Sequence, residues 1–195
     1  MTLIAAMCVF ALMMSISPGP VNLITLSSGV NHGVQKTLPF VSGATVGFTL
    51  LLMVLGLGLV QLLNAASPSL HYLGYFGAMF IIYMGYKIAT AKVDIVIKEV
   101  AIPRFYEGVL LQWLNPKAWI AAVSGISAFS VEDSYQVLFL FSGLYFVICF
   151  FSVASWAFVG ERLAMRIRSE VQMKLFNRIM GASLGIIGCY LLLAQ

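Results

Sequence analysis

The chain has 195 residues, of which 61% are hydrophobic and only 9% are charged. Soluble domains carry roughly 25% charged residues, so this composition cannot cover a water-exposed surface and indicates a membrane protein. The basic balance, a formal net charge of +4, comes from residues between the apolar segments. We therefore attribute it to membrane orientation, with lipid as a partner, and exclude nucleic acid.

Six apolar segments follow one another along the chain. Each has at least about 20 residues, enough to cross a hydrocarbon core about 30 Å thick, and a lipid-facing backbone must satisfy its own hydrogen bonds by forming helices. No Lys or Arg precedes Lys36, so we expect the first segment to be a retained span rather than a cleavable signal. The predicted spans are 3–29, 38–63, 69–90, 105–130, 135–159 and 173–194.

The connections between the spans differ in charge. Ten of the 11 Lys and Arg residues fall in the first, third and fifth connections, around 30–37, 87–104 and 160–178. The connections at 64–68 and 131–134 contain none. By the positive-inside rule the basic connections are cytoplasmic, which predicts that both termini lie outside.

Three spans precede the third connection and three follow it, so the second half enters the membrane with opposite polarity. This predicts one transmembrane domain over 1–195, with repeat halves of about 1–90 and 105–195. The first span of each half contains prolines, in SPGPVN and in NPKAW. Pro18 and Pro116 lie about 11 and about 12 residues from the cytoplasmic ends of their spans, near the bilayer middle. We therefore predict an all-α membrane protein of six transmembrane helices, arranged as a 3+3 inverted repeat whose first helix in each half is broken by proline.

Each predicted break has the residues of a new helix N-terminus. Ser17 before Pro18, and Asn115 before Pro116, are an N-cap residue followed by a proline at the first helical position. Free N–H groups and the helix dipole at such an end favour an anion, and Lys117 adds a cation there. Packing kinks are the alternative for the prolines, and snorkelling or pairing with a carbonyl is the alternative for Lys117. The predicted substrate-binding residues are Ser17, Pro18, Gly19, Pro20, Asn22, Asn115, Pro116 and Lys117.

Other polar residues leave two interpretations open. Asn22 could bind a ligand or a neighbouring helix. Glu107 lies in a first helical turn, where it could complement the dipole or take part in ion coupling. His32 could belong to a turn or to a proton relay. The GxxxG spacings at Gly29/Gly33, Gly43/Gly47 and Gly181/Gly185 favour internal packing over a dimer face.

The sequence contains no motif for a cofactor or for enzymatic chemistry. Its cysteines, Cys8, Cys149 and Cys189, have no metal-binding spacing. It contains neither an ATP-binding GxxxxGK[ST] loop nor the HExxH and GxSxG hydrolase motifs. We therefore predict no cofactor, no metal and no enzyme.

Several pieces of the sequence resemble the LysE/RhtB family of bacterial inner-membrane amino-acid exporters. They are SPGPVN, SSGVNHG, SGATVG, YFGAMFIIYMG, FYEGVLLQWLNPKAW and FNRIMGASLGIIG. Within the family, KIATA and SVASWAFVG look closer to the cysteine and O-acetylserine exporter branch than to the lysine exporter branch. The resemblance implies a secondary transporter that exports small amino acids or their derivatives, coupled to an ion gradient, with the proton as the expected ion. It leaves a homo-oligomer open.

The alternative function is an aquaporin-like channel for small solutes, since half-helix N-termini meeting at the midplane also occur in such pores. Only Asn115-Pro116 matches their paired Asn-Pro-Ala motifs, and a buried lysine follows it. The carrier is therefore the leading hypothesis.

Overall fold

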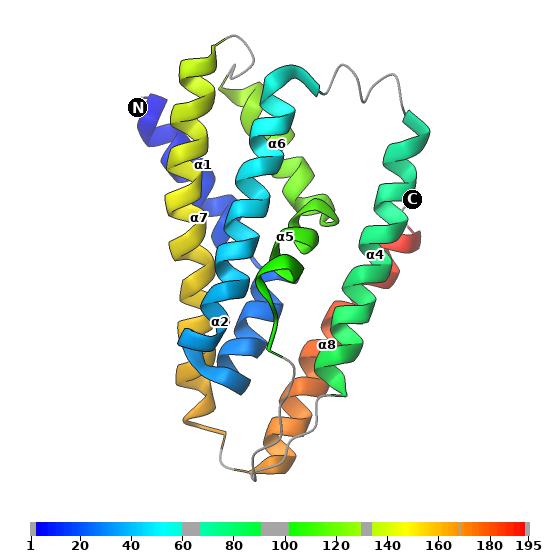
Figure 1. Ribbon diagram of the computed structural model, residues 1–195. Helices are drawn as coiled ribbons and strands as arrows, with labels where there is room; N and C mark the ends of the chain where they lie inside the picture. Colours follow the sequence, from blue (N-terminus) through cyan, green and yellow to red (C-terminus); the bar gives the residue numbers. More distant parts are fainter. Residues whose placement is uncertain (1–2, 60–66, 91–101, 130–133, 168, 194–195) are drawn as a thin grey trace.

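The computed structural model describes residues 3–59, 67–90, 102–129, 134–167 and 169–193. Within these ranges every regular element is helical, which confirms the predicted all-α class (Figure 1). The elements are α1 (Leu3–Ile16), α2 (Pro20–Val54), the π-helical η1 (Leu55–Leu59), α4 (Ser67–Ala89), α5 (Phe105–Trp113), α6 (Pro116–Ala128), α7 (Tyr135–Ala164) and α8 (Glu170–Leu193).

Two stretches of the described chain are long and apolar enough to cross a membrane by themselves, Pro20–Leu57 and Tyr135–Ala164. Shorter apolar helices cover Leu3–Ile16 and Met79–Ala89. In Leu3–Ile16 and Tyr135–Ala164 the apolar residues are distributed around the helix rather than along one stripe, as a lipid-facing helix allows.

Helix α2 turns back on itself at Gly33, where φ is 79° and ψ is 172°. The hydroxyls of Ser28 and Thr37 lie 2.8 Å apart, although nine residues of a straight helix would separate them by about 13.5 Å along the axis. Glycine adopts this positive φ without strain. The predicted connection around 30–37 is therefore wrong, since one residue makes the reversal. Pro39 lies inside α2.

The predicted connection over 160–178 is also too long, because α7 continues to Ala164 and α8 already begins at Glu170. Arg162 lies in the last turn of α7, where a cation complements the helix dipole. The predicted connections at 64–68, 87–104 and 131–134 fall largely outside the described residues.

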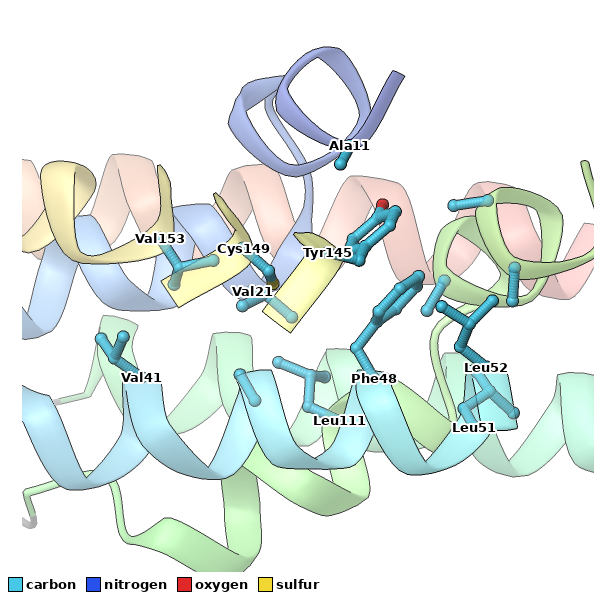
Figure 2. Packing of buried hydrophobic residues seen from close by; sticks show 14 of the residues in the cluster. Ala11, Val21, Val41, Phe48, Leu51, Leu52, Leu111, Tyr145, Cys149 and Val153 are labelled. Carbon is cyan, nitrogen blue, oxygen red and sulfur yellow. The ribbon is translucent and has the colours of Figure 1, made fainter. Parts of the chain in front are cut away.

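Helix α2 forms the centre of the bundle and packs against α7 and α5, whereas α4 and α8 pack mainly against each other at one flank (Figure 1). Figure 2 shows part of the buried core, with Phe48 of α2 beside Tyr145 of α7. The core side chains of Leu51, Leu52 and Leu111 are inaccessible to solvent.

Glycines allow the backbones of these helices to meet. A Cβ on Gly43 would overlap the carbonyl oxygen of Phe105, and one on Gly108 would overlap that of Phe40. Gly29 faces a carbonyl oxygen of α7 in the same way. Small residues serve this purpose at many membrane helix contacts. Packing inside the chain, as predicted for Gly29 and Gly43, is therefore confirmed.

We expect Gly108→Ala to lower the thermal stability of the purified protein in detergent. The added methyl group would push α5 away from α2, and overpacking of this kind costs about 1–3 kcal/mol. The matched control is Gly143→Ala on α7, because a Cβ there has no neighbour within 4 Å and alanine favours the helix. A midpoint of unfolding for Gly108→Ala equal to or above that of the control would contradict the close contact.

Candidate functional site

Two interruptions of the helices lie near each other. The first separates α1, which ends at Ile16, from α2, which begins at Pro20. Ser17 and Gly19 each precede a proline, and a residue in that position avoids the helical region. Gly19 is fully extended, with φ −175° and ψ 177°. The alternation of Ser-Pro-Gly-Pro thus keeps three residues out of the helix.

The expected role of Ser17 as an N-cap is wrong. The N-cap of α2 is Gly19, which offers no side-chain cap, and Pro20 rather than Pro18 is the first helical residue. The Ser17 hydroxyl instead donates to the Met14 carbonyl at 3.2 Å. A helix that began at Pro18 could not continue, because Gly19 precedes a second proline and takes the extended conformation that this favours.

The second interruption separates α5, which ends at Trp113, from α6, which begins at Pro116. Asn115 is the N-cap of α6, and its side-chain oxygen accepts the N–H of Lys117 at 3.2 Å. The N–H of Ala118 donates to the Asn115 carbonyl at 2.9 Å. Pro116 has no N–H, so the first donors of α6 are used within the chain.

The N-terminus of α2 differs from that of α6. The N–H of Leu23 donates to the Gly19 carbonyl at 2.9 Å. Helical geometry leaves the N–H groups of Val21 and Asn22 without an acceptor in α2. The expectation that both helix N-termini offer free N–H groups is therefore corrected. The N-terminus of α2 has free N–H groups, whereas those of α6 already donate to Asn115.

Lys117 connects the two interruptions. Its ammonium group donates to the carbonyl of Ser17 at 2.5 Å and to that of Pro18 at 3.3 Å. The side-chain amide of Asn22 donates to the carbonyls of Ser15 and Ser17, at 2.9 and 2.8 Å. Of the interpretations of Lys117, pairing with backbone carbonyls is thus observed. These contacts supply donors to the carbonyl end of α1, where the helix dipole favours a cation.

A pocket of about 40 Å³ lies between the interruptions. By volume it has room for a few water molecules. Its lining comes from α1, α2, α5, α6, α7 and both interruptions. The lining residues are Met14, Ser15, Gly19, Val21, Asn22, Phe48, Gln112, Asn115, Lys117, Ala118, Ala121, Tyr145, Cys149 and Val153.

The predicted binding residues come together at this pocket. Ser17 and Pro18 contact Lys117 through their carbonyls, and Pro20 and Pro116 are the first residues of α2 and α6. The predicted residues that line the pocket directly are Gly19, Asn22, Asn115 and Lys117.

The two residues considered for ion coupling do not line the pocket. Glu107 is buried on α5, where its carboxylate accepts the Lys87 ammonium at 2.7 Å and the Arg104 backbone N–H at 2.8 Å. His32 directly precedes the reversal at Gly33. Among the described residues, no group of three or more His, Cys, Asp or Glu side chains could hold a metal ion.

Several lining residues were missed at the sequence level. Tyr145, Cys149 and Val153 are spaced by four residues and so share one face of α7. Ser15 and Gln112 are polar residues in apolar helices, within one turn of an interruption. That proximity is a signal that could have found them, whereas nothing local singles out Tyr145.

Aromatic rings pack against one another beside the pocket. Tyr145 stacks on Phe48, with ring centroids 4.2 Å apart. Tyr145 and Phe141 pack edge to face, with ring centroids 5.7 Å apart. The ring centroids of Phe141 and Phe129 lie 5.1 Å apart, and those of Phe129 and Phe10 lie 5.7 Å apart. The rings thus contact one another in series, from Phe48 and Tyr145 at the pocket to Phe10 on α1.

A bundle of apolar helices with a pocket between interrupted helices, lined mostly by apolar residues and by a few polar ones, is the architecture of a membrane transport protein. The sequence pattern of LysE type translocators matches residues 12–195. The chain therefore belongs to the LysE type translocator family.

Several relatives of the chain are cysteine/O-acetylserine efflux proteins. The chain is 28% identical to the cysteine/O-acetylserine efflux protein of Escherichia coli (strain K12), over 82% of this chain and 83% of that protein. It is equally similar to the protein of that description from Shigella sonnei (strain Ss046). For the one from Klebsiella pneumoniae subsp. pneumoniae, 28% identity extends over 72% of each chain. No solved structure matches the chain.

We expect Lys87→Met to destabilise the protein more than the double variant Lys87→Met/Glu107→Gln. The Glu107 side chain is 8% exposed and that of Lys87 25% exposed, so removing the lysine alone leaves an unpaired, mostly buried carboxylate, whereas the double variant removes both charges. Thermal unfolding in detergent measures the difference. Equal loss in the single and double variants would show that the ion pair contributes nothing beyond packing.

Proposed function

We propose that the protein is a secondary-active exporter of small amino acids or their derivatives across the bacterial inner membrane. In this proposal the substrate carboxylate binds near the bilayer midplane, between the two interrupted helices. The observation that carries it is the meeting of a cation, Lys117, with the uncapped N-terminus of α2 at one pocket.

The proposed membrane arrangement has six spans. The first combines α1 with the part of α2 before Gly33, and the second is the part of α2 after it. Helix α4 is the third span, α5 with α6 the fourth, α7 the fifth and α8 the sixth. In support of a 3+3 inverted repeat, the interruptions after Ile16 and Trp113 fall in the first span of each half. Both termini then lie outside.

The carboxylate site is proposed at the N-terminus of α2. A Cβ placed on Gly19 would lie 3.2 Å from the Lys117 ammonium nitrogen, so this cation lies beside the glycine that begins the helix. The N–H groups of Val21 and Asn22 lack acceptors in α2, and Lys117 has three N–H donors. An anion there would gain both the helix dipole and a charge-assisted hydrogen bond.

The ammonium group of a zwitterionic substrate requires acceptors, and none of the described residues that line the pocket has a carboxylate. We assign this role to the side-chain carbonyl of Gln112, which is buried at the pocket. Among the described residues that line the pocket, Lys117 is the one with a charged side chain. A substrate with a cationic side chain would therefore be repelled. The description of the relatives as cysteine and O-acetylserine efflux proteins agrees with uncharged side chains.

A carrier fits the pocket better than a channel. The aromatic rings of Phe48, Tyr145, Phe141, Phe129 and Phe10 form a packed series beside it, which supports alternating access rather than an open pore. Coupling to an ion gradient, with the proton as the ion, belongs to this proposal. Glu107 already pairs with Lys87, so we assign it to stabilising the fold.

We expect Lys117→Ala to abolish counterflow of labelled L-serine in proteoliposomes. Lys117→Arg should fail as well, because a forked guanidinium is larger than an ammonium and does not fit the same two carbonyls. The control is Lys174→Ala, which removes an exposed lysine from an i,i+4 pair with Glu170. Correctly inserted Lys117→Ala protein with full counterflow would refute the carboxylate role.

The proposed orientation is tested by accessibility in intact cells. In a variant without the native cysteines, a cysteine at position 132 should react with a membrane-impermeant thiol reagent, and one at position 98 should react only after the cells are opened. Reaction at position 98 in intact cells would reverse the topology and the direction of transport inferred from it.

A further inference from the structure

Exposed arginines lie where α7 ends and α8 begins, at one end of the bundle (Figure 1). Arg162 is in the last turn of α7. Arg166 is in the turn that follows, and its backbone N–H donates to the Leu163 carbonyl at 2.9 Å. Arg178 is on α8, and all three arginines are exposed. None of them lines the pocket, so the proposed function gives them no role.

The reversal of α2 lies beside this end of α7. The N–H of Val34, the first after Gly33, donates to the Glu161 carboxylate at 3.1 Å. A Cβ on Gly33 would lie 2.8 Å from the same carboxylate. Lys36 is exposed two residues after Val34, and Arg162 directly follows Glu161. Two helices therefore bring a lysine and an arginine to one place.

Helix α8 contacts α2 just before the reversal. The side-chain amides of Asn31 and Asn177 exchange two hydrogen bonds, at 2.9 and 3.1 Å. Arg178 directly follows Asn177 and is exposed, so it lies where the three helices meet. The exposed cations at this meeting point, called the basic junction below, are Lys36, Arg162, Arg166 and Arg178.

The carboxylates of the described residues do not neutralise the basic junction. Glu170 pairs with Lys174 at 3.4 Å, and Glu107 pairs with Lys87 at 2.7 Å. Of the described carboxylates, that leaves Glu161 at the junction, where it offsets one of the four positive charges. The described part of the junction therefore keeps a net positive charge.

Exposed apolar side chains adjoin the basic junction. The Arg162 guanidinium lies over the ring of Phe158, 4.9 Å from the ring centroid. Phe158 is 49% exposed one turn earlier on α7, and Met165 is 63% exposed beside Arg166. Long basic side chains near the ends of membrane helices keep their charge at the lipid headgroups while their stems contact apolar surface. The junction thus has the residues expected where headgroups meet acyl chains.

We infer that the basic junction binds the phosphate of an anionic phospholipid in the cytoplasmic leaflet. A guanidinium binds a phosphate through two parallel N–H donors. A zwitterionic phospholipid also has a phosphate, but the same cations would repel its ammonium group. Basic sites between helices on the cytoplasmic side suit anionic headgroups for this reason. The leaflet follows from the proposed topology, whereas the lipid contact is independent of the pocket and of its substrate.

The test measures lipid binding to the intact, delipidated protein in detergent by native mass spectrometry. The probes are phosphatidylglycerol and phosphatidylcholine with identical acyl chains. Wild type should bind phosphatidylglycerol at least about tenfold more tightly, and Arg162→Gln and Arg178→Gln should each weaken its binding about fivefold. The matched control is Lys174→Gln, which removes an exposed cation of α8 that is paired with Glu170. This control should keep the wild-type preference.

The outcomes decide between a lipid site, a general charge effect and a site for a free anion. Equal affinity of wild type for the two lipids would overturn the inference, and that comparison needs no variant. An equal loss in Lys174→Gln and Arg162→Gln would overturn it as well, because overall charge would then explain the binding. So would displacement of phosphatidylglycerol by an excess of inorganic phosphate. Arg162→Lys, which keeps the charge, should retain most of the preference and replaces Arg162→Gln if that variant fails to fold.

Discussion

The structure depends on satisfying the carbonyl end of α1 inside an apolar bundle. A helix that stops in such surroundings leaves polar backbone groups that lipid cannot hydrogen-bond. Here Trp156 donates to the carbonyl of Ile16, Asn22 to that of Ser17, and Lys117 to those of Ser17 and Pro18. Lys117 lies directly after the other interruption, at the start of α6. Its hydrogen bonds to the end of α1 therefore hold the two interruptions next to each other. The pocket follows from that contact.

The helices around this junction are positioned by small residues and by one reversal. Gly33 turns α2 back, and the first N–H after it, that of Val34, donates to the Glu161 carboxylate of α7 at 3.1 Å. Close backbone contacts at Gly29 and Gly43 then hold the two parts of α2 against α7 and α5. Close contacts between backbones therefore fix how α2 lies against α7 and α5, the helices that contribute much of the pocket lining.

Polar links join the flanking pair α4 and α8 to the rest of the bundle. The ion pair of Lys87 with Glu107 connects α4 to α5, at 2.7 Å. The side-chain amides of Asn31 and Asn177 exchange two hydrogen bonds between α2 and α8, at 2.9 and 3.1 Å. Such pairs are specific in an apolar environment, because an alternative register would leave each partner unsatisfied. A few polar contacts thus fix the position of α4 and α8, whereas close packing fixes that of α2 against α7 and α5.

The sequence by itself determined the features that depend on composition or on adjacent residues. The low number of charges and the long apolar segments were sufficient to predict an all-α membrane protein. The pair Asn115-Pro116 was sufficient to predict where α6 begins. Ser17-Pro18 has the same local pattern, but the second proline at position 20 moved the helix start. Only the tertiary structure decided that Gly33 alone makes the reversal, that Lys117 binds the end of α1, and that Ser15 lies against Tyr145 and Cys149. The contacts of Lys117 and Ser15 join residues about 100 or more positions apart, and no local propensity encodes which distant groups will meet when the helices pack.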